Sequence, residues 1–143
     1  MIHFELVTLN GTKFASDAHE VLLPTPQGII AVFQHHMPLI SIAVPGIINV
    51  RKKANDPDDL MTTYATNGGI IEIADNGIRV LVDEADTADE INEKEAEKAH
   101  QEALELKRTA KDQVSLDKAQ SLLDRSAVRL KVSELKRRRR RNQ

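Results

Sequence analysis

The chain has 143 residues, of which 41% are hydrophobic and 29% charged, a composition typical of a globular protein. Its length suits one domain, or a small domain with an appendage. It contains no cysteine, which excludes disulfides, thiol catalysis and cysteine-based metal sites. No stretch reaches the ~18 consecutive apolar residues of a membrane span, and the first residues lack the basic and apolar regions of a secretory signal. These features are compatible with a reducing, cytoplasmic compartment.

The net charge of −2 conceals an uneven distribution of charge along the chain. Residues 1–86 carry five Lys or Arg against eleven Asp or Glu, whereas residues 87–143 carry fifteen against eleven. The first part is therefore acidic and the second basic, with six basic residues in one uninterrupted run from Lys136 to Arg141. A basic tail of this kind favours an acidic partner.

A change in composition divides the chain near Asp86–Thr87. Every proline and glycine lies at or before Gly77, and all four aromatic residues lie before residue 65. The remainder is rich in Ala, Glu, Lys, Leu and Arg, which favour long helices. We therefore predict a β domain over residues 1–86 and a helical domain over residues 87–143.

The first part reads as a series of short strands. β-branched runs over residues 2–7 and 46–50 lie between turn-forming residues. The runs 69–73 and 78–82 flank Asn76-Gly77, a favoured two-residue hairpin connection, and a second hairpin is expected to join Val50 to Leu60. This pattern predicts an antiparallel β-sandwich or barrel.

The second part reads as two helices joined by a turn. Thr87-Ala88-Asp89-Glu90 has the pattern of a capping box, which predicts that the first helix starts there. The turn is expected within residues 109–115, with Asp112 or Ser115 as the second N-cap. Each helix carries a narrow apolar stripe, Ala96, Ala99, Ala103, Leu106 and Ala110 in the first and Leu116, Ala119, Leu123, Ala127 and Leu130 in the second. The stripes predict an antiparallel helical hairpin, and since alanine buries little area, this hairpin needs a partner surface and can change position.

No constellation of residues predicts catalysis. The nucleotide-binding and hydrolase motifs are absent from the sequence. His35 and His36 are adjacent and would point to opposite faces of a strand, so we predict no metal site. Glu72 and Asp83 fit the solvent-facing positions of a half-buried hairpin. The sequence therefore predicts a protein that is not an enzyme and that needs no cofactor.

The basic tail leaves three interpretations open. Lys and Arg at the end of a helix complement its dipole and are commonly only solvated. Alternatively, they engage an acidic protein surface, through Arg125, Arg129, Lys131, Lys136, Arg137, Arg138, Arg139, Arg140 and Arg141. A third interpretation is a nucleic-acid-binding module, although no aromatic residue lies among the basic ones to stack on bases.

Two stretches of the sequence resemble the epsilon subunit of bacterial F-type ATP synthases. One is Pro24-Thr25-Pro26-Gln27-Gly28 with His36-Met37-Pro38-Leu39 and Pro45-Gly46. The other is Gly68-Gly69-Ile70-Ile71-Glu72-Ile73 followed by Val80-Leu81-Val82-Asp83. The resemblance covers nearly the whole chain in order, including a β domain of this length and a two-helix C-terminal part.

The resemblance implies a non-catalytic rotor component at the cytoplasmic face of the bacterial cell membrane, attached only through its complex. Its partners would be the gamma subunit, the c-ring and the alpha and beta subunits, and no nucleic acid. The contacts to the c-ring and gamma would come from Gly28, Ile29, Ile30, Ala31, His36 and Pro38. The nine basic residues named above would meet an acidic segment of a beta subunit when the hairpin is extended, and so block ATP hydrolysis.

This chain departs from the family pattern at three places. Ile29 replaces a usual Glu in the loop that faces the ring, and Ala31 replaces a usual Gly, so we expect a ring contact that is more apolar than usual or is shifted in position. Asn92 and Glu95 replace the Asp and Arg of an ATP-binding motif, although Arg125 and Arg129 match it, so we expect weak or absent ATP binding. The run that ends at Arg141 is longer than usual, which suggests a stronger electrostatic contact with the beta subunit.

Overall fold

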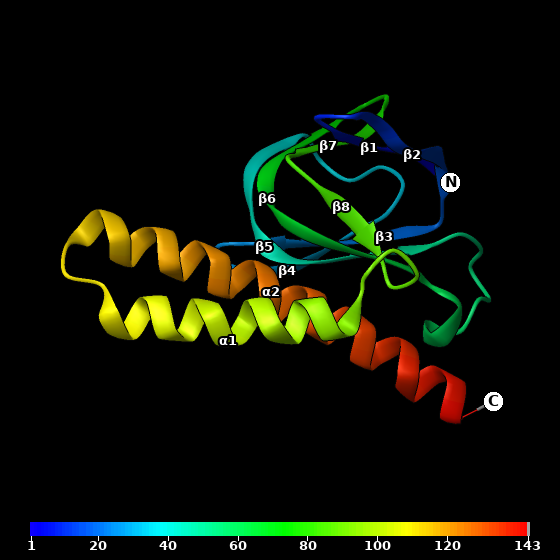
Figure 1. The fold of residues 1–143 in the computed structure, drawn as a ribbon. Coiled ribbons are helices and arrows are strands. Elements are labelled where there is room, and N and C mark those ends of the chain that lie inside the picture. The colour runs from blue at the N-terminus through cyan, green and yellow to red at the C-terminus, as the bar shows by residue number, and fades with distance from the viewer. Residues whose placement is uncertain (143) are drawn as a thin grey trace.

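The computed structural model describes residues 1–142, and Gln143, the last residue of the predicted helical part, lies outside the described residues. A β-sandwich is followed by a helical hairpin that lies along one side of it (Figure 1), so the predicted fold class is confirmed. The strands are β1 (Ile2–Thr8), β2 (Gly11–Ala18), β3 (Glu20–Thr25), β4 (Gly28–Val32), β5 (Leu39–Arg51), β6 (Thr62–Ala74), β7 (Gly77–Val82) and β8 (Ala85–Thr87). A single 3-10 turn, η1 (Asp58–Leu60), lies between β5 and β6, and the helices are α1 (Glu93–Thr109) and α2 (Gln113–Arg141).

The strands form one continuous sheet that closes over its own core. The strand order is β2-β1-β7-β6-β5-β3-β4, and β8 pairs with the first half of β6. In β1 the side chains alternate, so that Ile2, Phe4 and Leu6 are buried while their neighbours are not. The core is aliphatic with two aromatic rings, and its largest fully buried members are Phe4, Leu6, Leu23, Ile48, Ile71 and Ile73.

The long strands β5 and β6 connect the two layers of the sandwich. β7 pairs with the second half of β6, over Gly69–Ala74, whereas β3 pairs with the other end of β5. Between these halves Gly68 has φ +90°, and a Cβ on Gly69 would lie 1.9 Å from the carbonyl oxygen of Leu81. Glycine is therefore required where the strands bend and approach each other.

Two details of the sheet differ from the sequence-based expectation. The β6–β7 hairpin is present, but its two-residue turn is Asp75-Asn76, and Gly77 already pairs with Ala74. Gly77 is needed for another reason, because a Cβ there would lie 2.4 Å from the carbonyl oxygen of His3. The second difference is that β1 and β7 pair in parallel, although every other strand pair within residues 1–142 is antiparallel. This parallel pairing is what brings Gly77 beside His3.

The first helix starts later than the capping-box pattern predicted. Glu90 does accept a hydrogen bond from the backbone N–H of Thr87, at 2.8 Å, but Thr87 ends β8 and residues 88–92 form a connection. The N-cap of α1 is Asn92, whose side chain accepts from the backbone N–H of Glu95. Asp112 caps α2 in the same way by accepting from Ser115, as predicted.

The helices pack through small residues, and the hairpin docks on the sandwich. Ala96 and Ala103 of α1 and Ala119 of α2 are buried, but Leu106 and Ala127 of the predicted stripes are exposed. Val132 of α2, which is outside the predicted stripe, is buried instead. It lies with Ala65, Ile91 and Ala96 in a second, smaller apolar cluster. The buried face of α2 therefore turns from α1 toward β5 and β6 along its length.

Candidate functional site

The residues predicted to contact the ring lie at one edge of the sandwich. β3 and β4 form a hairpin, and β4 is the last strand of the sheet. Gly28 opens β4 at φ +116°, and its carbonyl oxygen accepts a hydrogen bond from the Thr25 hydroxyl at 2.6 Å. Ile29 is 71% exposed and Ala31 is exposed, whereas Ile30 packs against the core. The edge hairpin therefore presents an apolar surface to solvent.

His36 and Pro38 lie in the loop that follows β4. The Nδ1 atom of His36 lies 2.7 Å from the carbonyl oxygen of Met37, which ties the imidazole to the loop backbone. The loop also contacts the N-terminus of the chain, because the Met1 ammonium group donates to the Gln34 side chain at 2.7 Å. The edge hairpin and this loop, residues 28–38, thus form one continuous surface.

The structure gathers histidines that are distant in the sequence. His3, His35 and His36 line a hollow of about 620 Å³, together with carboxylates such as Asp17, which lies 3.1 Å from His3. Within residues 1–142, no group of three or more His, Asp or Glu side chains has an arrangement that suits a metal ion. The hollow can hold water or a polar partner side chain.

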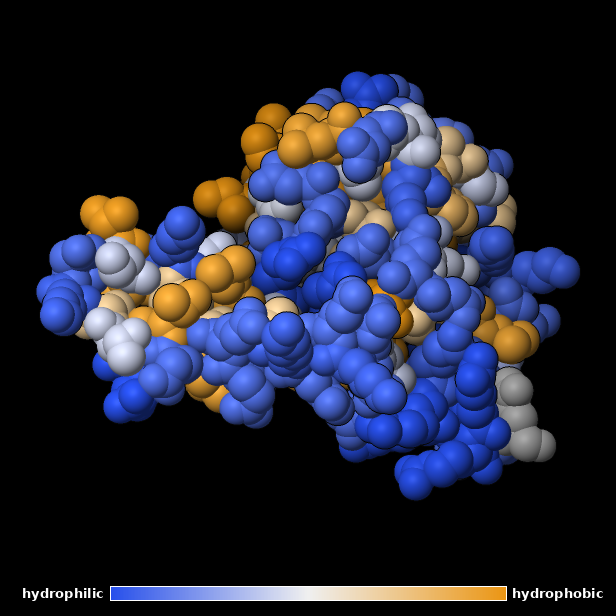
Figure 2. All heavy atoms as spheres, in the orientation of Figure 1, coloured by the Kyte–Doolittle hydropathy of each residue, from blue (hydrophilic) through white to orange (hydrophobic). Residues whose placement is uncertain are grey.

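A second apolar surface was not predicted from the sequence. Ile42, Ile70 and Leu81 are directly paired across β5, β6 and β7, so their side chains lie in a row on the outer face. They are 64%, 52% and 43% exposed. Figure 2 shows apolar side chains gathered at the top of the sandwich, over the region where Figure 1 places β6 and β7. The signal was the unbroken runs Ile70-Ile71 and Val80-Leu81-Val82, because a strand with one solvated face would alternate with polar residues.

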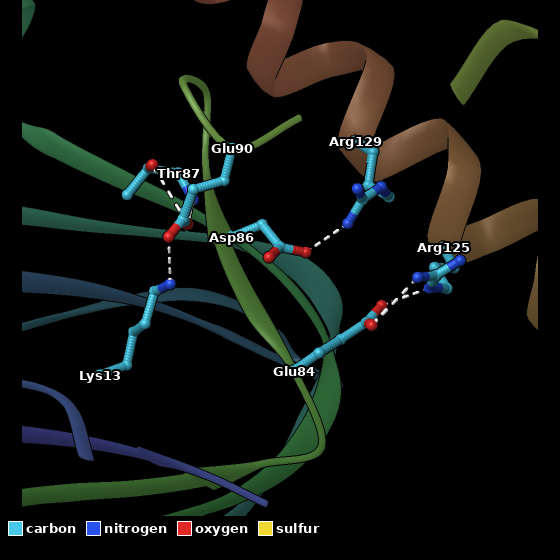
Figure 3. A network of polar contacts seen from close by, with 7 residues as sticks. All are labelled: Lys13, Glu84, Asp86, Thr87, Glu90, Arg125 and Arg129. Atoms are coloured by element: carbon cyan, nitrogen blue, oxygen red, sulfur yellow. Dashed lines mark hydrogen bonds and ion pairs between the residues drawn. The ribbon is translucent and has the colours of Figure 1, made fainter. Parts of the chain in front are cut away.

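The basic residues of α2 do not all face solvent. Arg125 makes two hydrogen bonds to the Glu84 carboxylate, one of them at 3.0 Å, and Arg129 pairs with Asp86 (Figure 3). The Arg125 guanidinium holds the pKa of Glu84 below its ordinary value, with a smaller contribution from the charge of Arg129. Lys136 pairs with Asp89 in the connection before α1.

The rest of the tail divides between paired and unpaired cations. Arg139 donates to the carbonyl oxygens of Met61 and Asp58, each at 3.0 Å, and so fixes the end of α2 beside η1. Arg137 and Arg138 form ion pairs with Glu93 and Glu134, at 3.3 and 2.7 Å. Within the described part of the chain no ion pair is formed by Lys131, Arg140 or Arg141.

A hollow of about 320 Å³ lies between the two helices, where the resemblance would place a nucleotide. Its walls include Arg125 and Arg129, but also the carboxylates of Glu95 and Glu102. Both arginines already face carboxylates of this chain, so their positive charge is largely neutralised in the docked hairpin. The arrangement disfavours a polyphosphate.

No helix within residues 1–142 is long and apolar enough to cross a membrane.

Comparisons with known proteins agree with this architecture. Residues 1–88 match the family model described as ATP synthase, Delta/Epsilon chain, beta-sandwich domain. The chain is 31% identical over 138 residues to the ATP synthase epsilon chain of Herpetosiphon aurantiacus, covering 96% of this chain and 98% of that relative. It is 36% identical over 122 residues to the epsilon chain of Delftia acidovorans, covering 85% and 86% of the two chains.

The fold is also similar to that of a chain in the cryo-EM structure of the Euglena gracilis mitochondrial ATP synthase. The TM-score is 0.78 at 18% sequence identity, over 93% of this chain and 81% of that one. An epsilon chain is a subunit of a larger complex and is not itself catalytic, which confirms the prediction that the protein is not an enzyme. The match over both the sandwich and the helices means that this chain belongs to the ATP synthase epsilon chain family.

Proposed function

We propose that the chain is a rotor subunit of an F-type ATP synthase, in which residues 1–86 couple the gamma subunit to the c-ring and residues 87–143 conditionally inhibit ATP hydrolysis. The observation that carries this proposal is the family match over 96% of the chain, which includes the helices as well as the sandwich. The protein would then lie at the cytoplasmic face of the bacterial membrane, held there through its complex.

The sandwich has two apolar surfaces for its two partners. The edge hairpin and the loop after it, with Gly28, Ile29, Ile30, Ala31, His36 and Pro38, are assigned to the c-ring and its junction with gamma. The row formed by Ile42, Ile70 and Leu81 is assigned to gamma, since an exposed apolar row is a common feature of a protein interface. Both assignments rest on exposure and on the resemblance to the family.

Inhibition is assigned to the basic residues of α2. In the docked hairpin Arg125, Arg129 and Lys136 face acidic groups of this chain, so contact with an acidic segment of the beta subunit requires the hairpin to leave the sandwich. Some cations are available to the beta subunit even while the hairpin is docked, namely Lys131, Arg140 and Arg141. The proposed surface for the beta subunit also includes Arg137, Arg138 and Arg139. Because so many of these cations are matched to carboxylates, the proposal includes no nucleic-acid partner.

The decisive measurement is ATP hydrolysis by the cognate alpha–beta–gamma complex with the full chain or with residues 1–88, the range that includes all of β8. Binding of both versions is verified in the same samples. We expect both to bind and only the full chain to slow hydrolysis. Equal hydrolysis with both bound would contradict the inhibitory assignment, and failure of both to bind would contradict the coupling assignment as well.

ATP is not expected to regulate this hairpin strongly. The hollow between the helices contains Glu95 and Glu102, whose charges repel a polyphosphate. Calorimetry with the full chain should detect no binding at sub-millimolar ATP. A Glu95→Arg variant, which restores the family's positive charge, is the matched test and should bind ATP more tightly than the natural chain.

A further inference from the structure

A short acidic segment, residues 84–89, contacts the basic face of α2 at three points. Its carboxylates Glu84, Asp86 and Asp89 pair one to one with Arg125, Arg129 and Lys136. The first two pairs are drawn in Figure 3, where both carboxylates point from the β8 region toward the helix. The partners are 41, 43 and 47 residues apart in sequence, so each pair joins the sandwich side of the molecule to the second helix.

The three cations share one face of the helix. Arg129 and Lys136 follow Arg125 by four and eleven residues, which correspond to about one and three helical turns. The carboxylates come from a stretch of only six residues that follows β7, includes β8 and leads toward α1. One acidic stretch therefore covers one basic stripe, and the two are aligned over their whole length.

These ion pairs contribute modestly to the docked state. The Arg129–Asp86 pair is the most protected, with side chains 19% and 27% exposed, whereas Asp89 is 82% exposed. Beneath them the apolar contact between helix and sandwich is small, with Ala65, Ile91, Ala96 and Val132 as its buried members. A partner that offers several carboxylates can therefore compete with the internal segment.

We infer that residues 84–89 are an internal competitor for the surface with which α2 would bind an acidic protein segment. This inference rests on the proposed function. We call residues 84–89 the latch, because their carboxylates hold α2 in the docked position. Each cation is matched to one carboxylate, so the latch and an acidic partner exclude each other. Because Glu84 and Asp86 already neutralise Arg125 and Arg129, the hairpin stays docked without a bound anion between the helices.

The test compares two triple variants of the full chain that have the same net charge. One removes the latch by Glu84→Gln, Asp86→Asn and Asp89→Asn. The control removes three exposed carboxylates of the helices that do not contact the sandwich, by Glu97→Gln, Glu105→Gln and Asp117→Asn. A synthetic hexaglutamate peptide is the probe, and its dissociation constant is measured by calorimetry at low salt.

Hexaglutamate should bind the latch variant about three- to tenfold more tightly than the control variant, since three ion pairs of modest strength no longer compete with it. Equal affinities for the two variants would overturn the inference. A paired charge reversal, Glu84→Arg with Arg125→Glu, checks that the pair itself matters, because the double reversal should restore docking that Glu84→Arg alone disrupts.

Docking is followed directly through labels, which is convenient because the chain has no native cysteine. Spin labels at Asp59→Cys and Arg141→Cys report the distance between η1 and the end of α2, which Arg139 holds together in the docked state. The latch variant should show a larger population of long distances than the control. Identical distance distributions in both variants would count against the latch.

The outcomes separate this inference from the proposed function. If the latch variant binds hexaglutamate more tightly but inhibits ATP hydrolysis no more than the control variant, the latch stands and the inhibitory assignment fails. If it inhibits hydrolysis more strongly without a change in hexaglutamate affinity or label distance, the inhibitory assignment stands and the latch fails.

Discussion

Single side chains of the docking contact make it sensitive to acid. Glu84 has a pKa below its ordinary value of 4.5, chiefly because Arg125 donates hydrogen bonds to its carboxylate. A carboxyl group with a lowered pKa stabilises the docked state above its ordinary pKa, and this contribution is lost as the pH falls through the lowered value. The contribution of Glu84 to docking is therefore complete at neutral pH and is lost when acid protonates this carboxylate.

We expect docking to weaken as the pH is lowered below 4.5, with the label distance between residues 59 and 141 as the measure. Glu84→Gln should weaken docking at neutral pH and reduce its dependence on acid, because the titrating group has been removed. Glu97→Gln, on an exposed face of α1, is the control and should leave the pH profile unchanged. An unchanged profile in Glu84→Gln would contradict the role given to this carboxylate.

Ile70 is the central residue of the apolar row on the sheet. If this row binds gamma, Ile70→Lys places a charge where an apolar side chain is buried in the complex. We expect binding to the gamma subunit to weaken at least about tenfold, measured by calorimetry or co-purification. Val114→Lys makes the same chemical change at a residue that is 79% exposed in α2, and it should bind gamma as the natural chain does. Normal binding of Ile70→Lys would exclude the row from the interface.

At the scale of the elements, the packing between α2 and the sandwich depends on few apolar contacts. Val132 is 1% exposed and lies in the small cluster that joins the helix to β6 and to the connection before α1. Other apolar side chains at this contact are only partly buried, and they are Ile47, Ala88, Val128 and Leu130. Removing one larger side chain should therefore have a measurable effect on docking alone.

Val132→Ala should make docking of the hairpin less favourable by about 1–2 kcal/mol. This is the transfer free energy of the two buried methyl groups that the substitution removes. Hydrogen exchange of α2 amides measures the docking equilibrium, and the amides of the sandwich should be unaffected. Val114→Ala is the matched control on the same helix, since this side chain is exposed. Equal exchange in the two variants would contradict the assigned role of the second cluster.

Local signals predicted the elements better than their ends. The strands, the order of sandwich and hairpin, and the Asp112 cap follow from β-branched runs, composition and capping chemistry, all of which act over a few residues. The predicted start of α1 was wrong because Thr87 pairs with Tyr64 and so belongs to β8. The capping pattern is local and carries no information about this distant contact. The turn at Asp75-Asn76 was displaced by one residue, because Gly77 is required beside His3.

At the scale of the whole molecule, the sandwich and the hairpin belong to two parts of the chain that carry opposite net charge. The acidic first part and the basic second part, net −6 and +4, meet in the Arg125–Glu84 and Arg129–Asp86 ion pairs and where Arg139 contacts η1. Contacts between partly exposed charges are weakened by salt, whereas the core of the sandwich, with Phe4, Leu6 and Ile71 fully buried, is not. Ionic strength should thus separate docking of the hairpin from folding of the sandwich.

Raising the salt concentration from about 0.01 M to about 1 M shortens the screening length from ~30 Å to ~3 Å. We expect the population with long distances between residues 59 and 141 to increase over this range. The thermal unfolding midpoint of residues 1–88 should change little in parallel measurements. A docked population that does not respond to salt would show that the apolar cluster, rather than the ion pairs, dominates docking.

The sequence by itself determined the fold class, the division into strands and helices, the family resemblance and the concentration of basic charge on the second helix. Each of these depends on composition, on local periodicity or on motifs that are continuous in the chain. Only the tertiary structure decided that Glu84 and Asp86 face Arg125 and Arg129, and that Ile42, Ile70 and Leu81 form one row. The physical reason is that sheet register and helix docking bring together residues far apart in the chain, and these distances are set by the packing of the whole molecule.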